Sequence, residues 1–451
     1  MNPEIDGKPV VILGSGPGGL AAALCLLQNG IKPVIFERSS QVGGLMQSVV
    51  EDGFRVDLGR KELYSRIPEV NKFWSDILGK DYVRYDHRVG ILYKGHIYES
   101  SAQYKGITRG MSLPLFAACF ADKIYSRIAF YKPTNYAQYR YRSAGKKITE
   151  IFSQGFQERF NGEDWRMLSI PMQTPTSGVA SQTEWRHPRL GSGQIVETLA
   201  ASIRKLNGEI ETDVQLTGVI TKDNIITGVI TNKNGNSSHI EVSSLISAIQ
   251  PETLGRMLFN DRSNNPVSSS QGVLLVYLFI DESPRFPHAW LNVSCPRLKI
   301  GRITNYAMFG GDMVPPGKCC LCIEYFLRSD DELFLYPEEK LYSFTLDQCN
   351  HLNLFEPSKI IRYRVFNFPQ VNAAASWSDN IKNKNQNALL KKLSAYDNLY
   401  NIARAGTDRA THAGLIAAES LMNKNKERFE LLTDPCTPEP WLTIKHQNQP
   451  N

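Results

Sequence analysis

The feature that most constrains this chain is a glycine-rich turn between an apolar run and a helix-forming run near the N-terminus. The apolar, β-branched residues 10–13 lead into the pattern G-x-G-x-x-G, and residues 20–27 continue as a helix-forming run. Gly14 permits a tight turn, Gly16 lets a pyrophosphate approach the backbone, and Gly19 lets the helix pack close to the strand. The free amides at the start of the helix then face the anion. Strand, turn and helix in this order predict a dinucleotide-binding site.

An acidic residue at the end of the next apolar run narrows the choice of dinucleotide. Glu37 directly follows the run at 33–36, which is the first strand-like run after the helix-forming run. A carboxylate in that place can accept hydrogen bonds from both ribose hydroxyls of an adenosine. The same charge repels a 2′-phosphate, so NADP is disfavoured although Arg38 is adjacent.

The length and composition of the chain favour two domains. Its 451 residues include 42% hydrophobic and 21% charged residues, which is ample for two cores and too long for one compact unit. The net charge of +6 comes from 51 basic and 45 acidic residues spread along the chain, so it gives little reason to expect nucleic acid as a partner. It modestly favours an anionic substrate or a membrane surface.

Hydrophobic periodicity predicts the main elements of the second half of the chain. Short β-rich runs separated by turns indicate a meander, and other runs have helical spacing. We expect strands at 209–211, 216–221, 225–231, 239–242, 272–280 and 319–327, and helices at 195–206, 338–349 and 410–422.

A second pair of glycines, Gly43 and Gly44, follows Glu37 and indicates either another close approach of backbone to ligand or an ordinary turn. The segment from Gly14 through Gly44, continued by residues 53–59, resembles the N-terminal region of the FAD-dependent amine oxidase, protoporphyrinogen oxidase and UDP-galactopyranose mutase group. Further segments follow the order seen in this group, so the resemblance spans most of residues 8 to 422. These segments are 66–74, 92–95, 186–193, 368–371 and 399–418.

The resemblance implies an α/β fold with two domains. One is a Rossmann-like FAD-binding domain that is discontinuous in sequence, and the other is an α+β substrate domain of mixed sheet and helices. The expected parts are 1–95, 181–265 and 385–430 for the FAD-binding domain, 96–180 for helices and 266–384 for the sheet of the substrate domain, and 431–451 for a polar C-terminal tail.

The resemblance also implies which residues hold FAD. They lie in the glycine turn, at the end of the second strand, in the segment that closes the flavin site, and at one position beside the adenine. They are Gly14, Ser15, Gly16, Pro17, Gly18, Gly19, Glu37, Arg38, Gly43, Gly44, Leu45, Gly59, Val214, Gly406, Asp408, Ala410 and Thr411.

The chain departs from the group's pattern next to the redox centre. Relatives often show Asp-x-Gly-Gly-His after the segment at 53–54, whereas this chain has two cations, Arg60 and Lys61, after Gly59. A positive charge near the flavin speeds electron acceptance, or the cations bind a substrate carboxylate or phosphate. The alternative is that both point to solvent or pair with Glu62. We expect Arg60 and Lys61 to be the catalytic residues, and the missing histidine weakens a mutase interpretation.

No other catalytic pattern stands out in the sequence. Several aromatic, arginine and histidine residues could line a substrate cavity, although packing is the commoner role for such side chains. They are Tyr64, Arg66, Tyr93, Trp185, Arg186, His187, Tyr306 and Tyr325. The eight cysteines have no disulfide framework, and the cluster at 319–322 reads as a buried strand, so we expect reduced thiols and no metal.

The N-terminal residues and the apolar segments give evidence on where the protein lies in the cell. The first residues lack the basic and apolar regions of a signal peptide, so we expect a cytoplasmic protein. Residues 111–131 come nearest to a membrane segment. We expect them to form a helix packed on its own core, with a helix lying on a membrane surface as the alternative. The sequence does not indicate an oligomeric state.

Three functions are consistent with these features. We expect an FAD-dependent oxidoreductase that removes two electrons from a C–N, C–O or C–C bond of a small or cyclic metabolite, with the biosynthesis of a glycan or secondary metabolite as one setting for such a reaction. The first alternative is a redox-neutral flavoenzyme of the sugar-nucleotide mutase type. The second is a protein that binds FAD or another nucleotide without turnover. A fold-level resemblance does not decide among them.

Overall fold

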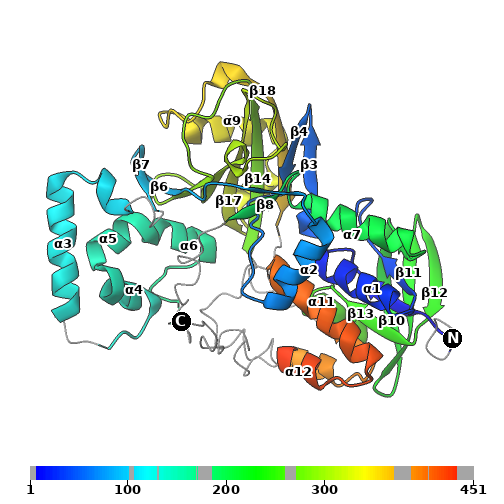
Figure 1. The fold of residues 1–451 in the computed structure, drawn as a ribbon. Coiled ribbons are helices and arrows are strands. Elements are labelled where there is room, and N and C mark those ends of the chain that lie inside the picture. The colour runs from blue at the N-terminus through cyan, green and yellow to red at the C-terminus, as the bar shows by residue number, and fades with distance from the viewer. Residues whose placement is uncertain are drawn as a thin grey trace, which may run out of the picture.

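The computed structural model contains a parallel-sheet unit, a mixed-sheet unit and a helical lobe (Figure 1). The described residues are 7–100, 106–128, 132–168, 170, 185–259, 271–369, 388–404 and 406–433.

The parallel sheet is assembled from distant parts of the chain. Its order is β19-β13-β1-β2-β9, with every neighbouring pair parallel. Because the chain passes from β1 to β2 on one side and returns as β13 on the other, the carboxyl end of β1 is a topological switch point, where such sheets bind ligands. The strands are β1 (Val10–Leu13), β2 (Pro33–Phe36), β9 (Glu209–Glu211), β13 (Ser244–Ser247) and β19 (Leu399–Asn401).

Four helices share one apolar core with this sheet. The first, α1, is apolar on nearly all sides because it lies between the sheet and other helices. These helices are α1 (Pro17–Gln28), α2 (Pro68–Leu78), α7 (Gly193–Lys205) and α11 (Thr407–Met422). A short meander and two smaller helices complete this unit: β10 (Val214–Lys222), β11 (Ile225–Lys233), β12 (Asn236–Glu241), α8 (Pro251–Phe259) and α12 (Glu427–Thr433).

The second unit is a seven-stranded sheet of order β18-β14-β17-β16-β15-β6-β7, antiparallel except for the β15–β6 pair. Alternate residues of β14 enter two different cores, as the period of a strand requires. One core is covered by α9 (Glu338–Cys349), the other by the hairpin of β3 (Ser48–Glu51) and β4 (Phe54–Asp57). The sheet strands are β6 (Val89–Tyr93), β7 (His96–Glu99), β14 (Gln271–Ile280), β15 (Trp290–Val293), β16 (Arg302–Asn305), β17 (Cys319–Arg328) and β18 (Ile360–Phe368).

The strands and helices expected after residue 195 are all present, with ends that differ by a few residues. The strand β6, which lies before residue 95, pairs with β15 in the second sheet. Most of the expected tail at 431–451 lies outside the described residues.

A helical lobe projects from one side of the mixed sheet (Figure 1). It contains α3 (Leu113–Ile128), α4 (Tyr136–Ala144), α5 (Lys146–Thr149), a π-helical turn (Glu150–Gln154) and α6 (Gly155–Asn161). The expectation that the apolar residues of 111–131 pack on a core is wrong, because most of the large apolar side chains of α3 are exposed. Within the described part of the chain, no helix has both the length and the apolar character needed to cross a bilayer.

A second short sheet returns the chain to the parallel-sheet unit. Its strands are β5 (Tyr82–Arg84) and β8 (Arg186–Pro188), which are antiparallel. This pairing places the residues that precede α7 beside the segment that follows α2.

Candidate dinucleotide site

The glycine turn lies between β1 and α1 at the switch point. Gly14 has φ +96°, and a Cβ on Gly19 would lie 2.0 Å from the Gly14 carbonyl oxygen, so both positions require glycine. A Cβ on Gly16 would meet nothing within 4 Å, which leaves open space beside the backbone at the start of α1. Pro17 is the first residue of α1. The turn thus has the geometry of a phosphate cradle, with free amides at a helix N-terminus.

The second glycine pair lies directly against the first turn. The Gly43 amide donates to the Ser15 carbonyl at 2.9 Å, and a Cβ on Gly44 would lie 3.5 Å from Cα of Gly16. Gly43 has φ +110° and Gly44 has φ +55°. The two glycines therefore border the same open space as Gly16. They do not form a separate turn elsewhere in the structure. The neighbouring Leu45 is exposed.

The carboxylate of Glu37 is buried at the end of β2 and accepts four hydrogen bonds. Oε2 accepts from the amide and hydroxyl of Ser15, each at 2.8 Å, and Oε1 accepts from the amide of Ser39 at 2.8 Å and its hydroxyl at 2.5 Å. Burial alone would raise the pKa of Glu37, but these hydrogen bonds outweigh it, so the pKa lies below its ordinary value. Glu37 is therefore a fixed anion.

Two other expected residues lie near Glu37. The amide of Val214 donates to the Glu37 carbonyl at 2.9 Å, and the Val214 side chain is buried in the core below. Arg38 is exposed. Val214 is consequently next to the residue expected to hold the adenosine ribose.

The N-terminus of α11 meets the N-terminus of α1. A Cβ on Gly18 would lie 2.5 Å from the Ala410 carbonyl oxygen, and a Cβ on Gly414 would lie 2.0 Å from the Gly18 carbonyl oxygen. Only glycines allow this approach of the two backbones. Gly406, with φ +92°, precedes α11 and begins the turn into it.

Side chains fix the start of α11. The Ser65 hydroxyl donates to Asp408 Oδ2 at 3.1 Å, and the Thr411 hydroxyl donates to the Thr407 carbonyl at 2.8 Å. The Thr411 hydroxyl is therefore occupied within its own helix. Sequence reasoning missed Ser65, because no local pattern links it to a residue near the far end of the chain.

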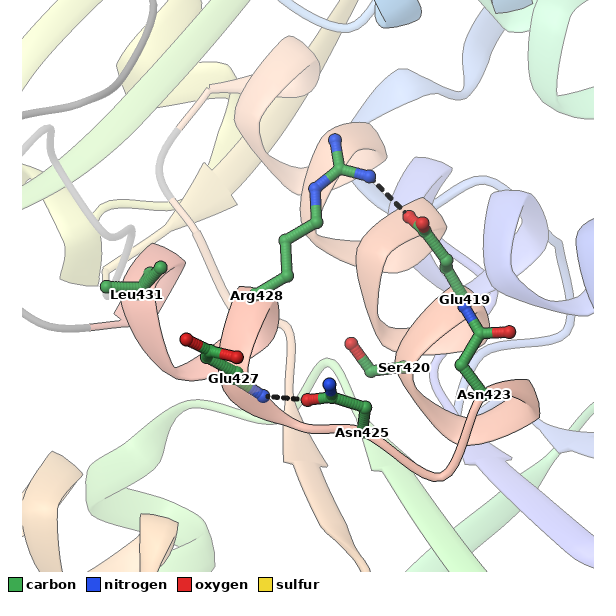
Figure 2. Close-up of a pocket in the computed structure, with 7 residues that line it drawn as sticks. All are labelled: Glu419, Ser420, Asn423, Asn425, Glu427, Arg428 and Leu431. Carbon is green, nitrogen blue, oxygen red and sulfur yellow. Dashed lines mark hydrogen bonds and ion pairs between the residues drawn. The ribbon is translucent and has the colours of Figure 1, made fainter.

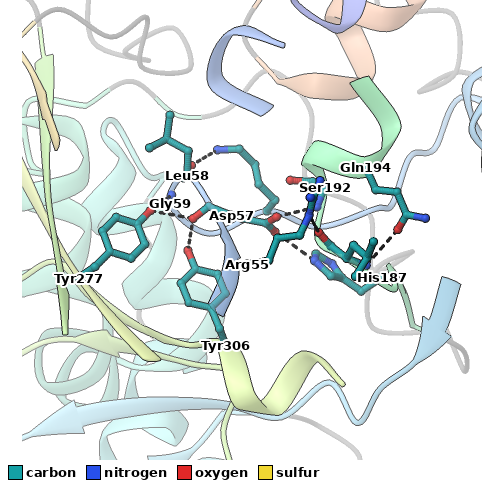
Figure 3. Close-up of polar contacts among 11 residues, drawn as sticks. Arg55, Asp57, Leu58, Gly59, His187, Ser192, Gln194, Tyr277 and Tyr306 are labelled. Carbon is teal, nitrogen blue, oxygen red and sulfur yellow. Dashed lines mark hydrogen bonds and ion pairs between the residues drawn. The ribbon is translucent and has the colours of Figure 1, made fainter. Parts of the chain in front are cut away.

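The turn after β4 is held by two tyrosines of the mixed-sheet unit (Figure 3). The Tyr277 hydroxyl accepts from the Gly59 amide at 2.7 Å and donates to the Asp57 carbonyl at 2.7 Å, while the Tyr306 hydroxyl donates to the same carbonyl at 2.8 Å. Gly59 has φ +70°. Burial raises the pKa of both tyrosines, so both hydroxyls stay protonated as donors. The backbone at 57–59 is thereby fixed between the two units.

The Asp57 side chain makes a separate set of contacts (Figure 3). Its Oδ2 lies 3.0 Å from Nε2 of His187, and its Oδ1 accepts from the amide of Ser192 at 2.6 Å. Burial alone would raise the pKa of Asp57, but His187 and the Ser192 amide lower it below its ordinary value. Asp57 and His187 are fully buried. His187 therefore serves here as the buried partner of Asp57.

Arg60 forms an ion pair with Glu62, which is one of the alternatives that the sequence left open. Its guanidinium lies 2.5 Å from Glu62 Oε2 and 4.6 Å from the centroid of the Trp290 ring. Burial works against the charge, but the Glu62 carboxylate raises the pKa of Arg60. His87 Nε2 lies 2.8 Å from the other oxygen of Glu62, and its ring stacks on Trp185 at 3.6 Å between centroids.

Lys61 does not pair with Glu62. Its Nζ donates to the Leu58 carbonyl at 2.6 Å and lies 4.0 Å from the position of a Cβ on Gly59. Burial lowers the pKa of Lys61, and the carboxylates of Asp57 and Glu324 partly offset this effect. Lys61 is thus a partly buried cation. It lies beside the turn at 57–59, where the two units meet.

The other aromatic and basic residues singled out in the sequence do not form one group. Tyr64 lies against Trp185, with 5.6 Å between ring centroids, and this pair adjoins the Glu62 cluster. Arg186 lies over the Tyr82 ring. The Tyr325 hydroxyl donates to Thr345 inside the core covered by α9, so packing explains Tyr325. The three cysteines at 319–322 are buried in β17, and burial raises the pKa of each thiol.

A polar hollow of about 240 Å³ lies at the other end of α11, between that helix and α12 (Figure 2). Arg428 pairs with Glu419 at 2.5 Å across it, and the Glu427 amide donates to Asn425 Oδ1 at 2.9 Å. The hollow is remote from the glycine turn, because it lies at the C-terminal end of a helix whose N-terminus meets α1. It is not part of the candidate site.

The fold and the turn define the class: this is a protein with a Rossmann-like dinucleotide-binding domain and a separate mixed-sheet domain. Residues 12–77 match the family of NAD(P)-binding Rossmann-like domains. Protoporphyrinogen oxidase 2 of Arabidopsis thaliana is 36% identical over 73 residues, which are 16% of this chain and 14% of that protein. The chain thus matches only a small part of the length of this curated relative.

Solved structures match nearly the whole chain. Reduced UDP-galactopyranose mutase superposes with a TM-score of 0.78 at 17% identity, covering 97% of this chain and 99% of that one. Putrescine oxidase bound to putrescine superposes with a TM-score of 0.60 at 13% identity, covering 92% and 99%. The chain therefore shares its two-domain fold with these enzymes.

Proposed function

We propose that this chain binds FAD and is an oxidoreductase that acts on a small, anionic molecule. The observation that carries the cofactor proposal is the meeting of the N-termini of α1 and α11 beside the open space at Gly16. Two helix N-termini directed at one place favour a pyrophosphate, because the amides and the dipoles of both helices stabilise negative charge.

The residues present fit the adenosine half of FAD. Glu37 is a buried anion at the expected ribose position, and Val214 is its neighbour. The Ser39 hydroxyl also lies 3.3 Å from the Gln41 carbonyl, so it has a second acceptor and can release Glu37 Oε1 to a ribose hydroxyl. The amides of Ser15 and Ser39 would continue to hold the carboxylate. The fixed charge of Glu37 supports FAD or NAD over NADP.

The residues at 59–61 support an anionic substrate. When bound, FAD supplies an acceptor for two electrons. Arg60 is neutralised by Glu62, whereas the nearest hydrogen-bond partner of Lys61 is a backbone carbonyl. Lys61 therefore has positive charge left to orient a carboxylate or phosphate at the junction of the two domains.

An absorption spectrum of the purified protein tests the cofactor. We expect flavin bands that Gly16→Val abolishes, because its side chain would occupy the open space beside the backbone where the phosphates are expected. Ala201→Val, which enlarges an exposed side chain of α7, is the matched control and should leave the bands unchanged. A colourless protein that stays empty with added FAD would overturn the proposal.

Anaerobic mixing with candidate substrates tests the reaction. Bleaching of the oxidised flavin by an anionic substrate supports oxidation. Activity that appears only after reduction with dithionite supports instead a redox-neutral reaction of the mutase type, which the superposition on reduced UDP-galactopyranose mutase makes the second candidate. Binding of FAD without either activity would indicate a non-catalytic protein.

Substitution of Lys61 tests its role in binding. Lys61→Met should raise KM for the anionic substrate at least tenfold, while Lys61→Arg should retain most of the affinity. Lys72→Met, on an exposed residue of α2, is the control. Full activity in Lys61→Met would remove this residue from the site.

A further inference from the structure

Helix α3 turns its apolar side toward solvent. The large apolar residues at positions 113, 116, 120, 124 and 128 recur at spacings of three and four, which places them on one helical face. Their exposed fractions are high, and Tyr125 adds to the same surface at 72%. The values are Leu113 84%, Phe116 41%, Phe120 57%, Ile124 46% and Ile128 64%.

The opposite face of α3 carries the buried residues of the helix, and these are small. Cys119 and Ser126 are its buried residues, and Asp122 Oδ2 accepts from the Lys147 amide at 2.8 Å where α5 begins. A surface helix of a globular protein normally buries its apolar stripe and exposes its polar one. This reversal indicates that the outward face of α3 has a partner outside the protein's own core.

The lobe that presents α3 is also strongly basic. Residues 113–161, which span α3 to α6, contain three acidic residues, so their net charge is 8 − 3 = +5. Lys123 and Arg127 lie on the exposed side of α3 itself, where long side chains can keep their charge at the edge of an apolar surface. The eight basic residues are Lys123, Arg127, Lys132, Arg140, Arg142, Lys146, Lys147 and Arg159.

The charge of the lobe and the length of α3 indicate which kind of partner binds the exposed face of this helix. A second copy of this chain would bring two lobes of charge +5 together, which like-charge repulsion opposes. An anionic lipid surface complements both the charge and the apolar face. With 16 residues, α3 is about 24 Å long, which is shorter than the hydrocarbon core of a bilayer, so it would lie in the surface rather than cross it.

We propose that α3 docks the helical lobe onto an anionic membrane surface, with Phe116, Phe120 and Ile124 inserted among the lipids. In Figure 1, α3 forms the outer edge of the lobe, away from both sheets. Docking there leaves the candidate dinucleotide site uncovered. The phenylalanine rings stack on each other, with 6.1 Å between centroids, and form the centre of the inserted surface.

Co-sedimentation with vesicles tests this proposal. The full chain should bind vesicles of phosphatidylcholine with 30% phosphatidylglycerol at least about tenfold more tightly than phosphatidylcholine alone, and less tightly as salt is raised. The triple substitution of Phe116, Phe120 and Ile124 to serine should reduce this binding at least about tenfold. Leu335→Ser removes an 85% exposed leucine outside the lobe and should bind as the parent does.

A charge reversal separates the electrostatic contribution. Lys123→Glu with Arg127→Glu should reduce binding to the anionic vesicles by at least about tenfold. Lys205→Glu with Lys222→Glu makes the same change of net charge outside the lobe and should have little effect. Circular dichroism confirms that each variant is folded.

Two outcomes would overturn the proposal. One is binding of the parent to neither kind of vesicle, or to both equally. The other is a parent dimer in sedimentation velocity that the triple serine variant dissociates, which would assign the α3 face to a second copy.

Discussion

The Asp57 carboxylate lies 3.0 Å from Nε2 of His187, and both side chains are fully buried. Asp57 ends β4, whereas His187 lies in β8, which follows the whole helical lobe in the chain. The contact therefore joins the hairpin that packs on the mixed sheet to the segment that leads into α7. Together with Tyr277 and Tyr306, it holds the turn that precedes Arg60 and Lys61.

We expect Asp57→Ala to lower the free energy of unfolding by about 3 kcal/mol, because it leaves buried His187 and the Ser192 amide without their partner. Asp57→Asn should cost less, since its amide oxygen can still accept from Ser192. Urea unfolding followed by circular dichroism measures both values. Asp76→Ala, which breaks only an exposed pair with Lys72, is the control. A loss below about 1 kcal/mol in Asp57→Ala would contradict the role given to this contact.

The two tyrosine hydroxyls should not be equivalent. Tyr277→Phe leaves the Gly59 amide unpaired and removes one donor to Asp57, so we expect a loss of about 2 kcal/mol. Tyr306→Phe leaves the Asp57 carbonyl with Tyr277 and should cost about 1 kcal/mol. Thermal unfolding of the two variants side by side gives the ranking, and the reverse order would refute it.

The backbones of α1 and α11 approach so closely at Gly414 that no side chain fits at this position. A methyl group there would lie 2.0 Å from the Gly18 carbonyl oxygen, so Gly414→Ala should lose about 3 kcal/mol or fail to fold. Gly16→Ala adds its methyl group in open space and should lose less than about 1 kcal/mol. Both are compared by urea unfolding of protein stripped of cofactor. Equal stability of the two variants would be inconsistent with this helix crossing.

Stability should fall in acid partly because of Glu62. Burial opposes its ionisation, but Arg60 and His87 lower its pKa from 4.5 to about 2. Since the folded state releases this proton more readily than the unfolded chain, the contribution is complete above pH 4.5 and is lost as the pH falls towards 2. Glu62→Gln should lose about 2 kcal/mol at pH 7 and show a flatter decline over that range. Parallel stability curves for parent and variant, measured between pH 7 and pH 3, would count against this prediction.

The local geometry of the candidate dinucleotide site was predictable from the sequence. Gly14, Gly16 and Gly19 act within one turn, where the need for a positive φ or for open space depends on near neighbours. Glu37 could be placed because the strand that precedes it pairs directly with β1. The meander also followed from periodicity and turn residues, since its strands are consecutive.

The contacts between distant segments were not predictable in the same way. Tyr277 and Tyr306 reach Asp57 only because β14 and the turn after β16 are stacked on the β3–β4 hairpin. His187 was considered for a cavity, but its partner lies in a much earlier part of the chain and no local pattern relates the two. The sequence does predict the apolar residues of α3, whereas the side on which they lie depends on the packing of α4 and α5 against that helix.

The order of strands in the parallel sheet has a consequence for synthesis. Its central strand β1 is made first, yet its neighbour β13 begins only at Ser244, and the edge strand β19 begins at Leu399. The second helix terminus at the cradle belongs to α11, which follows β19. A nascent chain therefore exposes an unpaired edge of β1 until β13 has left the ribosome, and the two helix termini of the cradle can meet only after α11 has also emerged.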